Sequence, residues 1–415
     1  MNSNAKSKPV LACFFFLIIV LTPVVLYAKC EQVTYPLSTK QQFIIDAKSC
    51  KVLLKSVNWF GAESQAYIPG GLDQQPLQNI VNLIKKGGFN SVRLPWSNEM
   101  VSKNPVVIIR LLKANPQLQG KTALAVFDAV INAIGQAGLM VILDNHRSRA
   151  DWCCDKEHGD GLWFSKEYPA ELFFKHWQQM TARYKDKPFV VASELRNEIR
   201  PDSIIGLEPD WGSKNPRTDW HMAATKAGNL IHRINPNVLI VVGGLRWQEN
   251  LEEVKKMPVK LDQPGKLVYA AHDYVWYHSP EELSDFELFK KSADRRWDFV
   301  LEPEKTYTAP VYLSEWGGCT QVNADDSRCP ENRYKFVEMF TKYLCSVDEN
   351  APVSWAYWAL NGNQLMGYSR TEGAVETYGL LKPDWQTWAS PQLINQLTGD
   401  GCKILKSNGS KNKIN

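Results

Sequence analysis

The chain has 415 residues, of which 44% are hydrophobic and 22% are charged, and its formal net charge is +4. These are ordinary values for a globular protein, and they exclude a disordered, collagen-like or coiled-coil chain. The small net charge, without a Lys/Arg block, also excludes nucleic acid as a partner. The unusual count is the 15 tryptophans. A sugar ring stacks well on an indole, so we expect some of them in a carbohydrate site and most in the core.

The first 28 residues are typical of a secretory signal peptide. A basic start is followed by an apolar run from Val10 to Leu26 and by a small residue, Ala28. The run is nearly long enough to span a bilayer, so a retained membrane anchor is the alternative. Pro23, near the end of the run, favours cleavage. We therefore expect a secreted, extracellular protein that has no membrane contact once the signal is removed.

Loss of the signal would remove Cys13 and leave an even number of cysteines, which is typical of exported disulfide-bonded proteins. The remaining cysteines are Cys30, Cys50, Cys153, Cys154, Cys319, Cys329, Cys345 and Cys402. Cys319 and Cys329 lie in one predicted loop and are the best local pair, whereas the adjacent Cys153 and Cys154 favour different partners. A zinc site is the alternative, but neither a Cys-x-x-Cys pair nor a histidine at ligand spacing supports it.

From residue 51 onward, short β-rich runs alternate with segments of helical periodicity. The predicted strands are Val52–Phe60, Ser91–Pro95, Met140–Asn145, Val190–Leu195, Leu239–Gly243, Leu267–His272, Val311–Glu315 and Val353–Ala359. The predicted helices are Pro76–Lys86, Ala123–Gln136, Ala170–Tyr184, Trp220–Ile234, Asp285–Phe299 and Asn332–Val347. Eight strands alternating with helices predict a (β/α)8 TIM barrel of the α/β class. An open doubly wound sheet is the alternative, but no glycine-rich nucleotide motif opens a helix.

Three parts of the chain follow from this pattern. Residues 1–28 are the signal peptide, residues 29–402 are a single catalytic barrel domain, and residues 403–415 are a flexible polar tail. Within the domain, residues 30–50 are expected to form a short N-terminal β-hairpin lid across the barrel bottom, with Phe43–Asp46 as one strand.

Two glutamates stand at the ends of predicted strands, where a barrel of this kind carries its reactive groups. Glu198 follows strand 190–195 and Glu315 ends strand 311–315, and these strands face one another across a barrel. Two carboxyl groups about 5 Å apart suit glycoside hydrolysis with a nucleophile and an acid/base. We expect the cation of Arg93 to keep Glu315 ionised as the nucleophile. Glu198, with less compensation, would hold its proton as the acid.

A metal site is the competing interpretation of the histidines at these strand ends. His146 and His272 would bind an ion together with Asp144 or Asp273. No further ligand stands at a motif spacing such as His-Glu-x-x-His. We therefore expect neither a metal ion nor a cofactor.

Taken together, the polar strand ends resemble glycoside hydrolase family five, the cellulase family of (β/α)8 barrels. The matching residues are Arg93, His146, Asn197, Glu198, His272, Tyr274, Glu315 and Trp358. The resemblance spans about residues 40–390. One departure is Ile199, because this family usually has proline after the acid/base.

The resemblance implies a role for each matched residue. Glu198 would be the acid/base and Glu315 the nucleophile. Arg93 and Tyr274 would hold Glu315 ionised, and Asn197 would bind the 2-hydroxyl of the sugar at the scissile bond. The remaining matches would line the same subsite, with His146 and His272 as hydrogen-bonding partners and Trp358 as its stacking floor. The candidates for further sugar subsites are Trp59, Trp96, Trp152, Trp163, Trp276 and Trp316.

These observations predict a monomeric, secreted, retaining endo-β-1,4-glucanase, a cellulase that acts on a polysaccharide or oligosaccharide. A β-mannanase, or another β-glycan or glycolipid glycosidase of the same mechanism, is the first alternative. An inert carbohydrate-binding protein is the second, although a pure binder has no use for a buried carboxylate pair.

Overall fold

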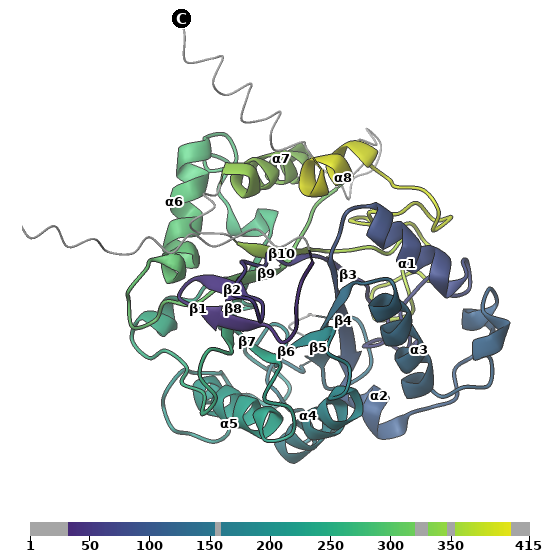
Figure 1. Cartoon of the computed structure of the whole chain (residues 1–415), viewed down its shortest axis with the longest axis horizontal. Coiled ribbons are helices and arrows are strands. Elements are labelled where there is room, and N and C mark those ends of the chain that lie inside the picture. The colour runs from purple at the N-terminus through teal and green to yellow at the C-terminus, as the bar shows by residue number, and fades with distance from the viewer. Residues whose placement is uncertain (1–31, 154–158, 320–330, 347–352, 400–415) are drawn as a thin grey trace, which may run out of the picture.

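The computed structural model describes residues 32–153, 159–319, 331–346 and 353–399. Within these residues, eight parallel strands close into one barrel, and helices surround it (Figure 1). The barrel strands are β3 (Lys55–Asn58), β4 (Ser91–Ser97), β5 (Met140–Arg147), β6 (Val190–Glu194), β7 (Leu239–Gly243), β8 (Leu267–Asp273), β9 (Val311–Trp316) and β10 (Ser354–Tyr357). Strand β10 pairs with both β9 and β3, which closes the ring. The predicted TIM barrel is confirmed, since an open sheet would leave two edges unpaired.

The helices bury an apolar stripe against the outside of the barrel. In α3, Val126, Val130 and Ile134 recur every four residues and are fully buried. The chain then turns at Gly138, whose φ of +75° favours glycine. The helices are α1 (Leu77–Lys86), α2 (Asn98–Lys103), α3 (Ala123–Gln136), α4 (Ala170–Tyr184), α5 (Trp220–His232), α6 (Phe286–Arg296), α7 (Glu331–Ser346) and α8 (Pro391–Thr398).

Most differences from the sequence prediction lie at element ends. The first and last barrel strands are shorter than predicted, and α6 ends at Arg296 because Trp297 leaves the helical region at φ −153°. A separate 3-10 turn, Asp298–Leu301, then completes the predicted segment. The two helices that the periodicity did not reveal, α2 and α8, have only six and eight residues, too few to repeat an apolar stripe.

The predicted hairpin is present as strands β1 (Ser38–Lys40) and β2 (Phe43–Ile45), which pair antiparallel. It lies across the barrel opening in the view of Figure 1. Leu37 and Ile44 share an apolar cluster with residues from the beginnings of the barrel strands, such as Met140 and Leu239. Because this contact closes the amino-terminal end of the barrel, polar chemistry is left to the opposite end.

The predicted signal peptide, residues 1–28, and the predicted tail, residues 403–415, lie outside the described residues. The same holds for Cys30, Cys154, Cys329 and Cys402. Among the residues that are described, no helix has the length and apolar character needed to cross a membrane.

Candidate active site

A cavity of about 630 Å³ opens at the carboxyl ends of the barrel strands. The predicted site residues that line it are His146, Asn197, Glu198, Tyr274, Glu315 and Trp358. Two further predicted residues, Arg93 and His272, are fully buried and contact the lining carboxyl groups from below. The barrel thus brings together side chains from six strand ends.

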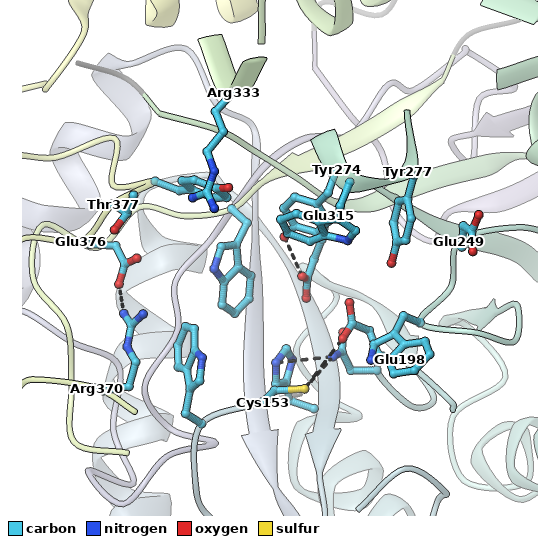
Figure 2. Close-up of a pocket in the computed structure, with 17 residues that line it drawn as sticks. Cys153, Glu198, Glu249, Tyr274, Tyr277, Glu315, Arg333, Arg370, Glu376 and Thr377 are labelled. Carbon is cyan, nitrogen blue, oxygen red and sulfur yellow. Dashed lines mark hydrogen bonds and ion pairs between the residues drawn. The ribbon is translucent and has the colours of Figure 1, made fainter. Parts of the chain in front are cut away.

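The two predicted catalytic glutamates face one another in this cavity. Glu198 follows β6, the fourth barrel strand, and Glu315 lies on β9, the seventh. Figure 2 shows both carboxyl groups pointing into the same part of the cavity. One oxygen of each carboxyl group and one nitrogen of His272 all lie within 4.8 Å of one another.

Glu315 accepts a hydrogen bond on each of its carboxylate oxygens. Arg93 Nη1 lies 2.8 Å from Oε1, and the Tyr274 hydroxyl donates to Oε2 over 2.9 Å. Donors to both oxygens favour the ionised carboxylate. Glu198 instead has His272 Nδ1 at 2.9 Å from its Oε1. The two carboxyl groups therefore differ in their hydrogen-bond partners.

The charge of Arg93 is shared among three carboxylates. Its guanidinium contacts Glu194 at 2.7 Å, Glu315 at 2.8 Å and Asp144 at 3.2 Å. Burial disfavours this cation, but the three carboxylates outweigh burial and raise the pKa of Arg93 well above its ordinary value. Arg93 consequently stays charged, but it is not a dedicated partner of Glu315.

The predicted contrast between the two glutamates is not found in their pKa values. Burial raises the pKa of Glu198 to about 7 and that of Glu315 to about 7 as well. Arg93 does not lower the pKa of Glu315 below that of Glu198, because its charge is shared with Asp144 and Glu194. Hydrogen-bond donors, and not net charge, separate the two roles.

An aromatic stack forms one wall of the site. The His146 ring is stacked on Trp358 with centroids 5.4 Å apart, and Trp358 is stacked on Phe60 at 5.3 Å. His146 Nδ1 lies 2.7 Å from Asp144 Oδ2, which orients the ring. Burial lowers the pKa of His146 well below its ordinary value, so the stacked ring is neutral.

Asn197 is oriented by Arg93 on one side of its amide. Arg93 Nη2 donates to Asn197 Oδ1 over 2.8 Å. This contact directs the Asn197 NH2 group toward His146 Nε2, at 3.5 Å, and toward the cavity. The amide therefore presents a donor next to the catalytic pair, as binding of a sugar hydroxyl requires.

Three tryptophans that the sequence suggested as sugar-contacting lie elsewhere. Trp59, Trp96 and Trp316 are fully buried and do not line the cavity. Side chains alternate between the inside and the outside of a barrel. Trp59 follows the inward Asn58, and Trp96 is three residues from the inward Arg93, so both point outward. The sequence expectation for them is corrected, because no sugar reaches a fully buried indole.

Trp316 is displaced by an irregularity in β9. The pairing of β8 with β9 shifts so that Leu313 pairs with Ala271 and Glu315 with His272. Ser314 is skipped, and both it and Glu315 make contacts at the inner side of the barrel. Trp316 therefore points outward, where it stacks on Phe340 of α7 with centroids 4.5 Å apart.

Of the further tryptophan candidates, Trp152 and Trp276 do line the cavity and Trp163 does not. Trp163 is buried against Trp220. Trp276 is 57% exposed and stacks on Tyr274 with centroids 4.5 Å apart. It offers an open indole face next to the tyrosine that contacts Glu315.

The sequence prediction missed two groups of residues in this region. One group lies beneath the cavity: Glu194 at the end of β6, Gln248 after β7 and Ser314 on β9, all buried. Polar residues inside otherwise apolar strands were the available signal for Glu194 and Ser314. The other group lines the cavity and lies on helices and loops beyond the strands: Trp247, Glu249, Tyr277, Arg333, Arg370, Glu376, Thr377 and Tyr378. Strand-end motifs carry no signal for that group (Figure 2).

Glu198, His272 and Glu315 are also close enough to share an ion, with candidate ligand atoms within 4.8 Å of one another. Both ring nitrogens of His272 already have protein partners, Glu198 Oε1 at 2.9 Å and Ser314 Oγ at 3.1 Å. An ion would have to replace one of these contacts. We therefore assign the three residues to acid–base chemistry.

A closed barrel of eight parallel strands with a close carboxyl pair at the ends of its fourth and seventh strands defines a class of protein, the (β/α)8 glycoside hydrolases. The family model described as Cellulase (glycosyl hydrolase family 5) matches residues 45–364. The chain belongs to this family.

Similarity to individual proteins extends over most of the chain. The endoglucanase of Paenibacillus polymyxa is 30% identical over 372 residues, covering 85% of this chain and 84% of that protein. A glycosyl hydrolase 5 family protein of Chamaecyparis obtusa is 28% identical over 388 residues, covering 87% and 65%. Among solved structures, the hyperthermophilic endocellulase from the archaeon Pyrococcus horikoshii matches with a TM-score of 0.72 and 25% identity, covering 88% of this chain and 100% of that one.

Proposed function

We propose that the protein is an endo-β-1,4-glucanase that hydrolyses a cellulose-type polysaccharide or its oligosaccharides with retention of anomeric configuration. Several of its relatives are named endoglucanases, and one matching structure is described as a complex with cellotetraose. The observation that carries the mechanism is the separation of Glu198 and Glu315, which have oxygens within 4.8 Å. Retaining enzymes hold their carboxyl groups ~5–5.5 Å apart, whereas inverting enzymes keep them ~6.5–9.5 Å apart to admit a water.

The two glutamates act in two successive displacements. Glu315 attacks the anomeric carbon while Glu198 gives its proton to the glycosidic oxygen, so the bond to that oxygen breaks and the leaving sugar departs with a hydroxyl group. Glu198 then takes a proton from water, the water oxygen attacks the anomeric carbon, and Glu315 is released as a carboxylate. Tyr274 and Arg93 stabilise that carboxylate through charge-assisted hydrogen bonds.

The aromatic side chains of the cavity extend the site along a sugar chain. Trp358, in its stack with His146 and Phe60, is the floor of the subsite at the reaction centre. Trp152 and the exposed Trp276 supply further faces. A cavity of about 630 Å³ has room for more than one sugar, which supports action within a polymer.

We also propose that the protein is exported as a disulfide-bonded monomer. Cys50, Cys153, Cys319 and Cys345 support this proposal, because each of them belongs to a disulfide bond, as is typical of exported proteins. Cys319 with Cys329 remains the proposed local pair. Mass spectrometry of the unreduced secreted protein would identify the pairs, and light scattering would give its oligomeric state.

Two amide variants test the catalytic assignment. Glu315→Gln should abolish hydrolysis while retaining substrate binding, because the amide is not a nucleophile. Glu198→Gln should lose hydrolysis of cellulose but keep glycosyl-enzyme formation from substrates with a good leaving group, which need no acid. Near wild-type activity of Glu315→Gln would overturn the mechanism. NMR of the first released anomer decides between retention and inversion.

A product screen tests the substrate. We expect short oligosaccharides from soluble cellulose and little release from mannan, xylan or glucosylceramide. Release from mannan or glucosylceramide alone would move the assignment to the corresponding glycosidase. Inactivity on all four, with oligosaccharide binding retained, would identify an inert carbohydrate-binding protein.

A further inference from the structure

A chain of four buried side chains runs beneath the cavity and ends at the proposed acid/base. Ser314 Oγ lies 2.8 Å from Glu194 Oε1, and His272 Nε2 lies 3.1 Å from the same Ser314 oxygen. On the other side of the ring, His272 Nδ1 lies 2.9 Å from Glu198 Oε1. None of the four residues is more than 8% exposed, so their own hydrogen bonds determine where the protons reside.

Glu194 determines which groups donate in this series of hydrogen bonds. Arg93 donates to both oxygens of this carboxylate, Nε to Oε2 over 2.7 Å and Nη2 to Oε1 over 3.1 Å. A bidentate guanidinium keeps Glu194 ionised, and an ionised carboxylate only accepts hydrogen bonds. The proton between Ser314 and Glu194 therefore belongs to Ser314.

Since the Ser314 hydroxyl proton points at Glu194, the Ser314 oxygen offers only lone pairs to His272. The nitrogen facing it, Nε2, must then carry a proton and donate it. In the opposite arrangement Ser314 would donate to His272. That arrangement would leave lone pairs of Ser314 and an ionised Glu194 facing each other across 2.8 Å.

The contacts of Gln248 also indicate that Ser314 donates to Glu194. Its Oε1 accepts the backbone N–H of Glu198 over 2.7 Å, which fixes the orientation of the amide. Its Nε2 therefore points at Glu194 Oε1, at 3.3 Å, and at Ser314 Oγ, at 3.4 Å. A second donor directed at Ser314 Oγ also favours the arrangement in which the Ser314 proton points at Glu194.

His272 is a neutral ring with its proton on Nε2. Burial, assisted by the charge of Arg93, lowers the pKa of His272 and outweighs the carboxylates Glu315, Glu194 and Asp144, which disfavours the imidazolium. A neutral ring protonated at Nε2 presents a bare lone pair at Nδ1. The 2.9 Å contact between Nδ1 and Glu198 Oε1 is then a hydrogen bond only when Glu198 holds a proton.

We propose that Ser314 is a positioning residue that, through the tautomer of His272, keeps the proton on Glu198 in the resting enzyme. This inference rests on the proposed function, because it assigns the proton that the acid step consumes. It also favours the return of a proton to Glu198 in the second step, since an ionised Glu198 faces the Nδ1 lone pair. Other charged or titratable groups around the Glu198–His272 pair are Arg93, Asp144, Glu194, Arg200, Tyr274, Tyr277 and Glu315.

The tautomer is measured directly by ¹⁵N NMR of the full-length protein labelled at histidine, with His272 identified by its loss in His272→Gln. We expect a protonated Nε2 and an unprotonated Nδ1 in the wild type at neutral pH. A protonated Nδ1 would overturn the proposal. This measurement needs no catalysis, so it is decided separately from the proposed function.

The pH profile tests the consequence for Glu198. In Ser314→Ala the ring is free to protonate at Nδ1 and donate to an ionised Glu198. The alkaline limb of kcat/KM on soluble cellulose should then move to lower pH by about one unit, the size expected for exchange of one hydrogen bond. An aryl cellobioside with a good leaving group should lose less activity. In Ser314→Thr, which keeps the hydroxyl, the alkaline limb should stay at its wild-type pH.

The outcomes separate the two proposals. An unchanged alkaline limb in folded Ser314→Ala would overturn the role of Ser314, and an equal loss on both substrates would do the same. A wild-type protein inactive on both substrates would instead overturn the proposed function. The circular dichroism spectrum and thermal midpoint of each variant establish that it is folded.

Discussion

The Tyr274 hydroxyl donates a hydrogen bond to Glu315 Oε2 over 2.9 Å, between two neighbouring strands of the barrel, while Arg93 donates to the other carboxylate oxygen. Because Arg93 is shared with two more carboxylates, Tyr274 is the donor that distinguishes Glu315 from Glu198. The nucleophile is thus identified by a hydrogen bond from the residue that follows β8 to the end of β9. Four predictions follow from this bond and from the site around it.

Tyr274→Phe should reduce kcat/KM by about 10-fold or more, since one hydrogen bond to a charged group is worth ~1.5–3 kcal/mol. The lost donor stabilised the ionised form, so the pKa of Glu315 should rise and the acidic limb of the pH profile should move to higher pH. Kinetics over a pH series check this. The control is Tyr269→Phe, whose hydroxyl accepts from Val259 outside the site. An unmoved acidic limb would contradict the role of Tyr274.

The wild-type pH profile should be bell-shaped with an optimum near neutral pH. Burial raises the pKa values of Glu198 and Glu315 to about 7, and the close pair shares one proton between its two titrations. Activity requires an ionised Glu315 and a protonated Glu198. It therefore falls as Glu315 is protonated at lower pH and as Glu198 is ionised at higher pH. An optimum below about pH 5, near ordinary carboxyl values, would count against this pair.

Asp160→Asn should destabilise the barrel by ~3–5 kcal/mol, the usual effect of leaving buried charges unpaired. Burial opposes the Asp160 charge, but Arg196 and Arg147 hold the pKa of this carboxyl well below its usual range. A depressed folded-state pKa contributes stability above the unfolded value of about 4, and this contribution is lost as pH falls through the folded value. Urea unfolding of both proteins at pH 7 and at pH 3 should show the difference shrinking at the lower pH.

The matched control is Asp128→Asn, because Asp128 also pairs with an arginine, Arg183, but both side chains are about one-third exposed. An exposed pair contributes at most ~1 kcal/mol. Equal losses of stability in the two asparagine variants would show that burial does not set the strength of the Asp160 contacts.

Trp276→Ala should affect substrate binding, whereas Trp316→Ala should affect stability. Trp276 is 57% exposed at the cavity, so its loss should raise KM for long oligosaccharides and leave the free energy of unfolding nearly unchanged. Trp316 is fully buried against Phe340, so its loss should cost ~3–5 kcal/mol of stability. Kinetics on cellotetraose and urea unfolding measure the two effects. Stability loss in Trp276→Ala without a change in KM would remove the proposed subsite.

Much of the barrel was predictable because its periodicity is local. In strand β7 (Leu239–Gly243) and helices α3 and α4 the predicted bounds coincide with the observed ones. Short elements such as α2 were missed, since six residues do not repeat an apolar stripe. Disagreement at the end of α6 arose because the backbone of Trp297, and not its side chain, stops the helix.

The site was predictable as far as strand ends reveal it. Glu198 follows a recognisable strand by a few residues and Glu315 lies near the end of another, and the barrel topology brings them together. Arg370 and Glu376, by contrast, pair with each other in a segment beyond the last strand and line the cavity wall. No local pattern connects such residues to the catalytic pair, because their neighbours come from distant parts of the chain.

The sequence by itself determined the eight alternating units, the carboxyl pair and the family, since apolar period and strand-end chemistry are properties of short segments. Only the tertiary structure decided which tryptophans face the cavity, because the shifted register at Ser314 sends Trp316 outward. It likewise decided the proton arrangement that begins at Glu194 and ends at Glu198. That arrangement depends on contacts of about 3 Å between side chains of β6, β8 and β9 and the residue Glu198 that follows β6. These contacts form only when the strands are assembled into the barrel.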